Sequence, residues 1–291
     1  MLGFMRVRIW DVEHGACAML QHLDGIYGGR LAMIDSGRSA TWNPAAYIRG
    51  TMGRTKLDYL FITNADRDHM SGLQGLADAG IDVETLYRNR TYTAEQIEQI
   101  KLQSGPLGSD AKQYVGMCGR YNGPVPAPFA QSMGGITEVT FRNPYPTFKD
   151  TNNLSLVVFI KYAHFKILFP GDLEKPGWSA LLQNENFRAE LAGTDVLVAS
   201  HHGRESGFCR DIFEYFMPSC VVISDKPIEH ETQQTVPDYR NVVRANGVKV
   251  RNAGGKPNTK GTRRVLTTRS DGWIQFDVDD ANYWVDTEYA W

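Results

Sequence analysis

The stretch that decides the fold runs from Thr63 to Gly72 and reads Thr-Asn-Ala-Asp-Arg-Asp-His-Met-Ser-Gly. It follows an apolar segment at 57–62, Leu-Asp-Tyr-Leu-Phe-Ile, which is typical of a buried strand. Asp66, Asp68 and His69 therefore arrive together where that strand ends. Because one divalent cation offsets the repulsion between two neighbouring carboxylates, this arrangement favours a metal site. Asp-rich turns also occur as ordinary solvated loops, so the interpretation depends on the rest of the chain.

Composition sets broad limits on what the protein is. The chain of 291 residues has 42% hydrophobic and 22% charged residues, as soluble globular proteins do. No apolar run approaches the roughly 20 residues that span a bilayer, and the N-terminal apolar run is too short for a signal peptide. We expect a cytoplasmic protein without a membrane partner and with reduced core cysteines. The net charge of −2 excludes bulk attraction to nucleic acid, which would need a local basic patch.

The hydrophobic pattern predicts two successive halves of similar plan. In each half strands come first and then alternate with helices, which implies two packed sheets with helices outside. We expect one domain over 1–291, with a loop or lid insertion at 105–135, where Gly, Pro and Ser show little periodicity. Strands are expected at 6–10, 16–20, 31–34, 57–62, 138–141, 154–160, 165–169, 195–199, 220–224 and 273–276, and helices at 44–51, 73–79, 93–103, 178–191, 209–216 and 239–245.

Two further strand ends carry metal-type ligands. Asp172 follows the strand expected at 165–169, and the pair His201 and His202 follows the strand at 195–199. Taken alone, Asp172 has an ordinary explanation as part of a Gly-Asp turn, and the histidine pair as a surface feature. Strands fix the backbone while the loops at their ends aim side chains, so three such ends together indicate a shared metal site.

The order of these motifs resembles that of the metallo-β-lactamase-fold hydrolases. The chain looks most like the metallo-β-lactamase-type domain of the ComEC competence proteins and their free-standing relatives. The resemblance covers nearly the whole chain, 7–276, and implies an α/β fold, the four-layer αββα sandwich. The motifs that carry it are Trp-Asp-Val-Glu-His-Gly at 10–15, Asp-Ser-Gly at 35–37, Asp-x-Asp-His at 66–69, Asn-Asn-x-Ser-Leu-Val at 152–157, Gly-Asp at 171–172 and Ser-His-His-Gly at 200–203.

The resemblance also implies a set of metal ligands, with departures. The family has histidine where this chain has Asn64, and its usual histidine before Gly-Asp is absent, with Asn153 in that place. One of two metal positions therefore loses its nitrogen ligands. Oxygen-rich ligation favours Mn²⁺ or Mg²⁺ as well as Zn²⁺, so the implied cofactor is one or two of these ions. The candidate ligands are Asn64, Asp66, Asp68, His69, Asp172, and one or both of His201 and His202.

The chemistry expected of such a site is hydrolysis. A divalent ion lowers the pKa of a bound water molecule, and Asp66 or Asp68 is placed to take the proton. The resemblance assigns His230 to the active site, as an acid for the leaving group or an oxyanion donor. A solvated loop histidine is the alternative for His230. The remaining histidines considered, which are assigned structural roles, are His14, His22 and His164.

Substrate specificity is inferred from a basic segment at 240–269, which contains no Asp or Glu. Such a segment is suited to phosphates, although a solvated basic face is the alternative. An acidic tail at 277–288 is able to pair with it. The proposed substrate-binding residues are Asn153, Lys256, Lys260, Arg263 and Arg264.

Three functions remain open at this point. The first is a metal-dependent phosphodiesterase, a nuclease acting on DNA or RNA through a metal-activated water. The second is a metal-dependent hydrolase of a small molecule such as a nucleotide, lactone or thioester. The third is a catalytically silent binding module in which the change at Asn64 has ended turnover.

Overall fold

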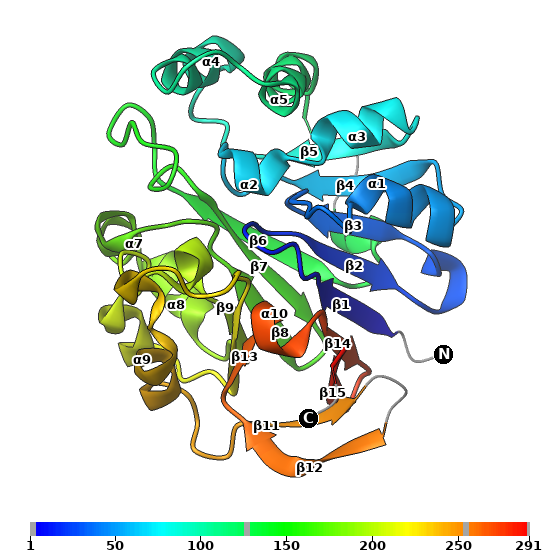
Figure 1. Cartoon of the computed structure of the whole chain (residues 1–291), viewed down its shortest axis with the longest axis vertical. Helices are drawn as coiled ribbons and strands as arrows, with labels where there is room; N and C mark the ends of the chain where they lie inside the picture. Colours follow the sequence, from blue (N-terminus) through cyan, green and yellow to red (C-terminus); the bar gives the residue numbers. More distant parts are fainter. Residues whose placement is uncertain (1–3, 125–128, 253–255, 290–291) are drawn as a thin grey trace.

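The computed structural model describes residues 4–124, 129–252 and 256–289. Within these ranges the chain forms a nine-stranded and a six-stranded sheet, which pack face to face. Helices cover the outer face of each sheet, on opposite sides of the molecule (Figure 1). The expected four-layer αββα sandwich is therefore confirmed.

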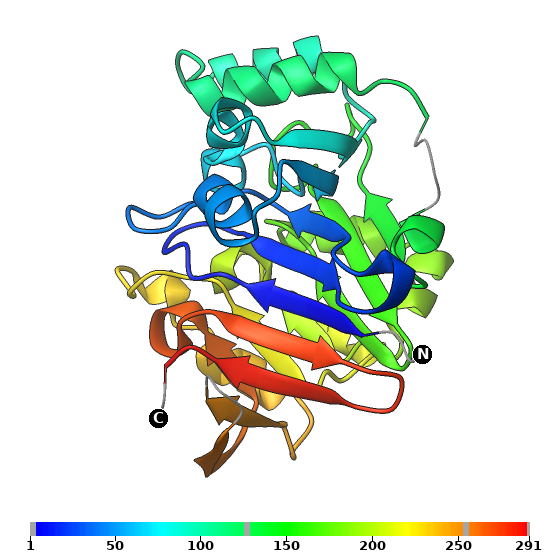
Figure 2. The same ribbon diagram turned by 90° about the vertical axis from the view of Figure 1, so that its right-hand side faces the viewer.

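The larger sheet contains the N-terminal strands and both ends of the described chain. Strand β4 pairs in parallel with β3 and β5, whereas β1 and β2 pair antiparallel. Figure 2 shows this sheet, with the C-terminal strands beside β1. Its order is β12 (Lys256–Arg263), β11 (Val248–Asn252), β15 (Tyr283–Thr287), β14 (Ile274–Val278), β1 (Met5–Ile9), β2 (Ala18–His22), β3 (Leu31–Ile34), β4 (Lys56–Phe61) and β5 (Asp82–Tyr87).

The smaller sheet comes from the second half of the chain. Two antiparallel pairings, one of them a hairpin, form one part of it, and three parallel pairings form the rest. Its order is β13 (Val265–Thr267), β10 (Cys220–Ile223), β9 (Val196–Val198), β8 (Phe165–Phe169), β7 (Leu156–Tyr162) and β6 (Thr137–Arg142).

The burial pattern along each strand shows which side chains face the other sheet and which face the outer helices. In β1 the alternate residues Met5, Val7 and Ile9 are buried between the sheets, as a period of two requires. Strand β7 is apolar on both faces, because Val158 packs between the sheets and Val157 packs under the outer helices. A continuous apolar run in the sequence thus marks a strand that is covered on both sides.

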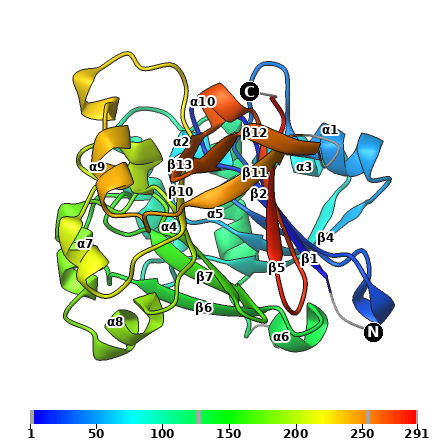
Figure 3. The ribbon, with the colours of Figure 1, turned by 90° about the horizontal axis from the view of Figure 1, so that it is seen from below.

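The outer layers differ in the helices that build them. Figure 3 shows the helices at 44–46 and 73–78 on one side of the sheets and those at 175–181, 185–191 and 236–241 on the other. On the larger sheet lie α1 (Pro44–Ala46), continued by a π-helical turn (Tyr47–Thr51), α3 (Leu73–Asp78), α4 (Ala94–Leu102) and α5 (Ser109–Arg120). On the smaller sheet lie α7 (Lys175–Leu181), α8 (Glu185–Leu191) and α9 (Val236–Asn241). The short helices are α2 (Arg67–Met70), α6 (Phe129–Ser132), α10 (Thr268–Asp271) and the 3₁₀ turns Gly25–Tyr27, Ser200–Gly203, Arg210–Glu214 and Glu231–Gln233.

The loop expected at 105–135 is wrong for most of its described length, because α5 occupies it together with the short α6. Helix α5 buries Tyr114, Met117 and Cys118, which share one face at the spacing i, i+3, i+4. The single helix expected at 178–191 is two helices, α7 and α8. In the described ranges, none of the helices has the length and apolar character needed to cross a bilayer.

Candidate metal centre

The stretch that follows β4 is held by close backbone packing. Helix α2 carries Asp68 and His69, and the carbonyl oxygen of Asp68 accepts a hydrogen bond from the amide of Ala16 (3.2 Å). A Cβ atom on Gly15 would lie 2.5 Å from that oxygen, and one on Gly37 would lie 2.6 Å from it. Glycine at both positions therefore lets the loops after β1 and β3 pack against α2.

Asp172 reaches the same place from the smaller sheet. It follows β8 through Gly171, which has a φ of +62° and packs against Thr63 and Ser155. The Asp172 amide donates to Ser155 Oγ (3.1 Å). This turn places a carboxylate of one sheet beside the motif of the other.

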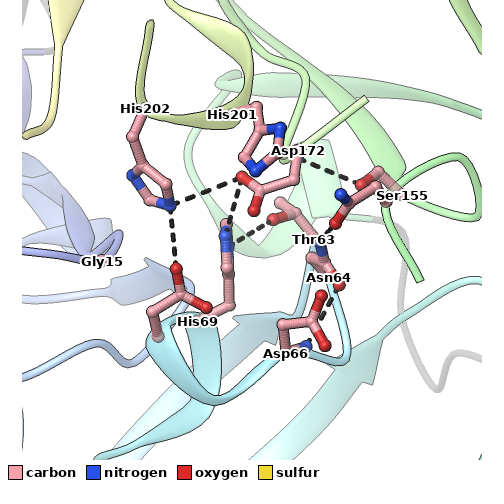
Figure 4. Close-up of polar contacts among 12 residues, drawn as sticks. Gly15, Thr63, Asn64, Asp66, His69, Ser155, Asp172, His201 and His202 are labelled. Atoms are coloured by element: carbon pink, nitrogen blue, oxygen red, sulfur yellow. Dashed lines mark hydrogen bonds and ion pairs between the residues drawn. The ribbon is translucent and has the colours of Figure 1, made fainter. Parts of the chain in front are cut away.

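His201 and His202 both adopt left-handed backbone conformations, with φ of 51° and 53°. Two consecutive non-glycine residues in this region carry strain, which often accompanies a functional site. As a result the two imidazoles diverge. His202 points toward His69 and Asp172 (Figure 4). His201 Nδ1 instead lies near Glu174 Oε1 (3.2 Å).

Four side chains meet at one point, and each offers one ligand atom. These atoms of Asp68, His69, Asp172 and His202 all lie within 4.8 Å of one another. His69 Nε2 is 2.9 Å from Asp172 Oδ1, and His202 Nε2 is 3.1 Å from Asp68 Oδ2. The structure thus brings together four of the predicted ligands, and of the histidine pair it places His202 in this group, called here the metal cluster.

The metal cluster fits a divalent ion, as the two imidazoles show. Nδ1 of His202 lies 3.0 Å from the Ser224 carbonyl oxygen, which only accepts, so Nδ1 carries the proton. Nδ1 of His69 is held by Asp35 Oδ2 (2.8 Å). Both Nε2 atoms are buried and, within the described residues, make no hydrogen bond of acceptable geometry. Two oriented nitrogens facing two carboxylates are a donor set for Zn²⁺, Mn²⁺ or a similar ion.

Charge coupling holds the metal cluster together. Burial alone would lower the pKa of His69, yet Asp172 and Asp35 raise that pKa well above its usual value. Burial likewise opposes charge on His202, whose pKa is raised by Asp172 and Asp68. Burial would raise the pKa of Asp172, but His69 and His202 bring it to about 2. The carboxylates are therefore ionised, and an incoming cation would replace protons on the imidazoles.

Asp66 and Asn64 lie outside the metal cluster, contrary to the expectation that they are ligands of the same site. Asp66 Oδ1 is 2.5 Å from Lys101 Nζ, and Asp66 Oδ2 accepts from Thr151 Oγ1 (2.6 Å). Asn64 Oδ1 accepts from the Asp66 amide (3.1 Å), and Asn64 Nδ2 donates to Asn152 Oδ1 (3.1 Å). Both side chains are committed to partners other than the four converging ligands.

Asn153 and His230 are also placed apart from the metal cluster. Asn153 Oδ1 accepts from the Gly177 amide (2.9 Å), and its Nδ2 donates to Asp150 Oδ1 (3.0 Å), so it ties loop 150–153 to α7. The His230 side chain is exposed before the 3₁₀ turn Glu231–Gln233. No contact in the described structure links either side chain to the four ligands.

The predicted basic surface is paired in part. Arg263 pairs with Asp271 (3.3 Å), and Arg264 Nε donates to the Ala245 carbonyl (3.1 Å). Six strands separate β12 from β4 in the order of the larger sheet, and β12 lies at the far end of the molecule (Figure 1). The side chains of Lys256 and Lys260 fall outside the described ones.

Two residues near the metal cluster were missed by the sequence interpretation. His14 Nε2 lies 3.3 Å from Asp68 Oδ2, and its ring centroid is 5.0 Å from that of His202, so this histidine lies beside the metal cluster. Asp35 orients His69. The signal for both was their position in a turn directly after a strand, the same signal that revealed Asp172.

Comparisons with known proteins identify the family of the chain. The model of the metallo-beta-lactamase superfamily matches residues 13–203. No curated protein sequence matches the chain. The metallo-beta-lactamase fold protein YhfI from Bacillus subtilis is 11% identical, with a TM-score of 0.49, covering 94% of this chain and 99% of that one. A mutant of the CmlA beta-hydroxylase is 13% identical, with a TM-score of 0.50, covering 94% of this chain and 54% of that one. At such identities, structural similarity indicates a shared fold alone.

Proposed function

Because the chain belongs to the metallo-beta-lactamase superfamily, whose members are metal-dependent hydrolases, we propose that it is a metal-dependent phosphodiesterase acting on DNA or RNA. The observation that carries the proposal is the pair of buried Nε2 atoms, of His69 and His202, that face the carboxylates of Asp68 and Asp172. These four residues would hold one divalent ion. When bound, such an ion supplies a Lewis acid that polarises a phosphoryl oxygen and lowers the pKa of water.

His14 is the proposed proton acceptor. Burial lowers the pKa of His14, with the neighbouring His202 acting in the same direction, so the imidazole is neutral near pH 7. A neutral imidazole at the rim of the metal cluster takes a proton from the attacking water at Nε2. Asp68, 3.3 Å away, stabilises the imidazolium that results.

Cationic side chains beside α2 support a phosphate-bearing substrate. A pocket of about 620 Å³ there is lined by Arg38, Arg67 and Lys101, with Asp110 as its acidic residue. A second pocket, of about 560 Å³, borders His201, and its cations Lys175 and Arg204 are balanced by Glu174 and Glu205. A strand of nucleic acid bound at the metal cluster would therefore place a flanking phosphate on the side of α2.

A small phosphorylated molecule is the second candidate substrate, and a specific observation favours it. Three of the six arginines of the segment 240–269 make ion pairs: Arg251 with Asp286 (2.9 Å), Arg263 with Asp271 and Arg269 with Asp225. These pairs reduce the positive charge that the segment offers to a long polyanion.

The test is a substrate panel with metal-reconstituted protein. Single- and double-stranded DNA, RNA, a chromogenic phosphodiester and nucleotides are each incubated with Zn²⁺, Mn²⁺ or Mg²⁺. Cleavage of polynucleotide supports the proposal, and cleavage of nucleotides alone supports the second candidate. Protein that binds less than one ion tightly and cleaves nothing would contradict both and indicate a silent binding module.

A further inference from the structure

We propose that the Lys101 ammonium occupies the place of a second divalent ion beside Asp66, so that the site binds one metal ion and Lys101 contacts an anionic oxygen of the substrate. The inference rests on the proposed function, and it assigns the anion-binding side of that site. It begins from the carboxylate of Asp66, which sits two residues before the ligand Asp68 and yet does not join it.

Both oxygens of Asp66 are already engaged. Lys101 Nζ lies 2.5 Å from Oδ1, and Thr151 Oγ1 donates to Oδ2 at 2.6 Å. The ammonium therefore neutralises the one carboxylate on which a second ion would depend. A divalent ion binding here would first have to displace a close ion pair.

The polar groups next to Asp66 do not replace its carboxylate as a ligand for a second ion. The Asn64 amide oxygen accepts from the Asp66 backbone amide, and the amide nitrogen donates to Asn152. An amide oxygen is a weaker ligand than imidazole for ions such as Zn²⁺. The group of Asn64, Asp66 and Asn152 therefore does not fit a second metal ion.

Lys101 is held in position by its helix. Helix α4 begins with a capping box between Thr93 and Gln96, and Ile97 anchors it in the core beneath. The side chain of Lys101 is 17% exposed, compared with 31% for Asp66, so the ammonium is directed inward. A lysine in the last turn also interacts favourably with the helix dipole.

Lys101 lines the pocket of about 620 Å³ whose other cations are Arg38 and Arg67, with Asp110 as its acidic member. Asp110 Oδ1 accepts from the Gln74 amide (3.0 Å) and keeps its negative charge. Three cations face this carboxylate and that of Asp66, which pairs with Lys101, so the pocket carries an excess of positive charge beside α2, the helix of Asp68 and His69. Such a charge suits a phosphoryl group of the substrate.

Metal stoichiometry tests the first half of the inference. Wild-type protein, Asn64→His and the double variant Asn64→His with Lys101→Met are dialysed against Zn²⁺, and bound metal is measured by elemental analysis and native mass spectrometry. We expect one ion in wild type, one in Asn64→His, and two in the double variant, because only that variant combines an added imidazole with a free Asp66. Two ions in wild type or in Asn64→His would overturn the inference and leave the proposed function intact.

Phosphate binding tests the second half. The affinity of the one-ion protein for inorganic phosphate is measured by calorimetry for wild type, Lys101→Met and Lys101→Arg, with Lys112→Met on the exposed face of α5 as the matched control. Loss of one charge-assisted contact predicts about a 10-fold weaker affinity for Lys101→Met and little change for the other two variants. A lower melting temperature with unchanged phosphate affinity would mean that the ion pair is only structural, and would overturn the assignment.

The same proteins separate this inference from the proposed function. Turnover of phosphodiesters by Lys101→Met should fall about 100-fold, as when one donor to a developing oxyanion is removed. One ion and Lys101-dependent phosphate binding, without turnover of any phosphodiester, would contradict the proposed function while supporting the role of Lys101.

Discussion

Asp35 Oδ2 lies 2.8 Å from His69 Nδ1, although the two residues follow different strands and are 34 positions apart. The same carboxylate accepts from the Thr63 amide (2.7 Å) and from Thr63 Oγ1 (2.5 Å), and it is buried. Asp35 therefore fixes both the orientation and the tautomer of the imidazole, which leaves Nε2 directed at the metal cluster.

Asp35→Asn should weaken metal binding while leaving the four ligands in place. The amide cannot match the charge of the carboxylate, and loss of such a partner typically reduces affinity by about 10- to 100-fold. Competition with a chelator measures the change. Asp58→Asn is the matched control, since Asp58 is an equally buried carboxylate that pairs with Arg30 and Arg54 away from the cluster. Equal loss of metal affinity in both variants would point to general destabilisation.

Asp172→Ala should abolish hydrolysis, with turnover reduced by about 1000-fold or more, because the variant removes the carboxylate that faces both imidazoles. Metal content should fall below one ion per chain, and circular dichroism should still report a folded protein. Asp78→Asn, on the exposed side of α3, is the control. Turnover at the wild-type rate with metal in excess would show that the carboxylate has been wrongly assigned.

His14→Gln should reduce turnover by about 100-fold, the usual contribution of a general base. Metal content should stay at the wild-type level, because Asp68 and His202 remain. The acidic limb of the pH–rate profile should also disappear, which a structural histidine would not cause. His164→Gln, in the exposed turn between β7 and β8, should behave as wild type.

Asp225 predicts a pH dependence of stability. Its Oδ2 pairs with Arg269, whereas its Oδ1 is buried and, in the described structure, has no hydrogen-bond partner. Burial raises the pKa of Asp225 from 3.8 to about 7, although Arg269 opposes the shift. Between these values the folded protein retains a proton that the unfolded chain releases, so this group makes stability fall as pH rises from about 4 to about 7.

Urea unfolding of wild type and Asp225→Asn measures that effect. The variant cannot titrate at this position. The unfolding free energy of Asp225→Asn minus that of wild type should therefore increase as pH rises toward 7 and then level off. A difference that is constant across this range would show that Asp225 stays ionised beside Arg269.

The sequence located the two halves of the metal cluster because each follows a strand with a clear apolar pattern. Asp68, His69 and Asp172 could be assigned from these strand ends taken together, and the layered fold follows from the order of the strands. The choice between His201 and His202 could not be made from the sequence, because it depends on two left-handed backbone conformations that no composition rule predicts.

Two of the errors come from pairing over long sequence separations. Asp66 pairs with Lys101, 35 positions later, and Arg251 of the basic segment pairs with Asp286. Helix α5 was overlooked for a local reason. Gly116 and Gly119 lower its helix propensity, and the buried face compensates only in the folded protein.

The metal cluster draws Asp68 and His69 from the end of β4, in the larger sheet, and Asp172 and His202 from the ends of β8 and β9, in the smaller one. Neither half of the chain can therefore capture an ion tightly until the two sheets have docked. An ion bound at that moment links the two sheets. It therefore slows the separation of the docked sheets during unfolding more than it speeds their docking during folding. Refolding in the presence of Co²⁺, followed by its visible absorption, would thus time the docking of the two sheets.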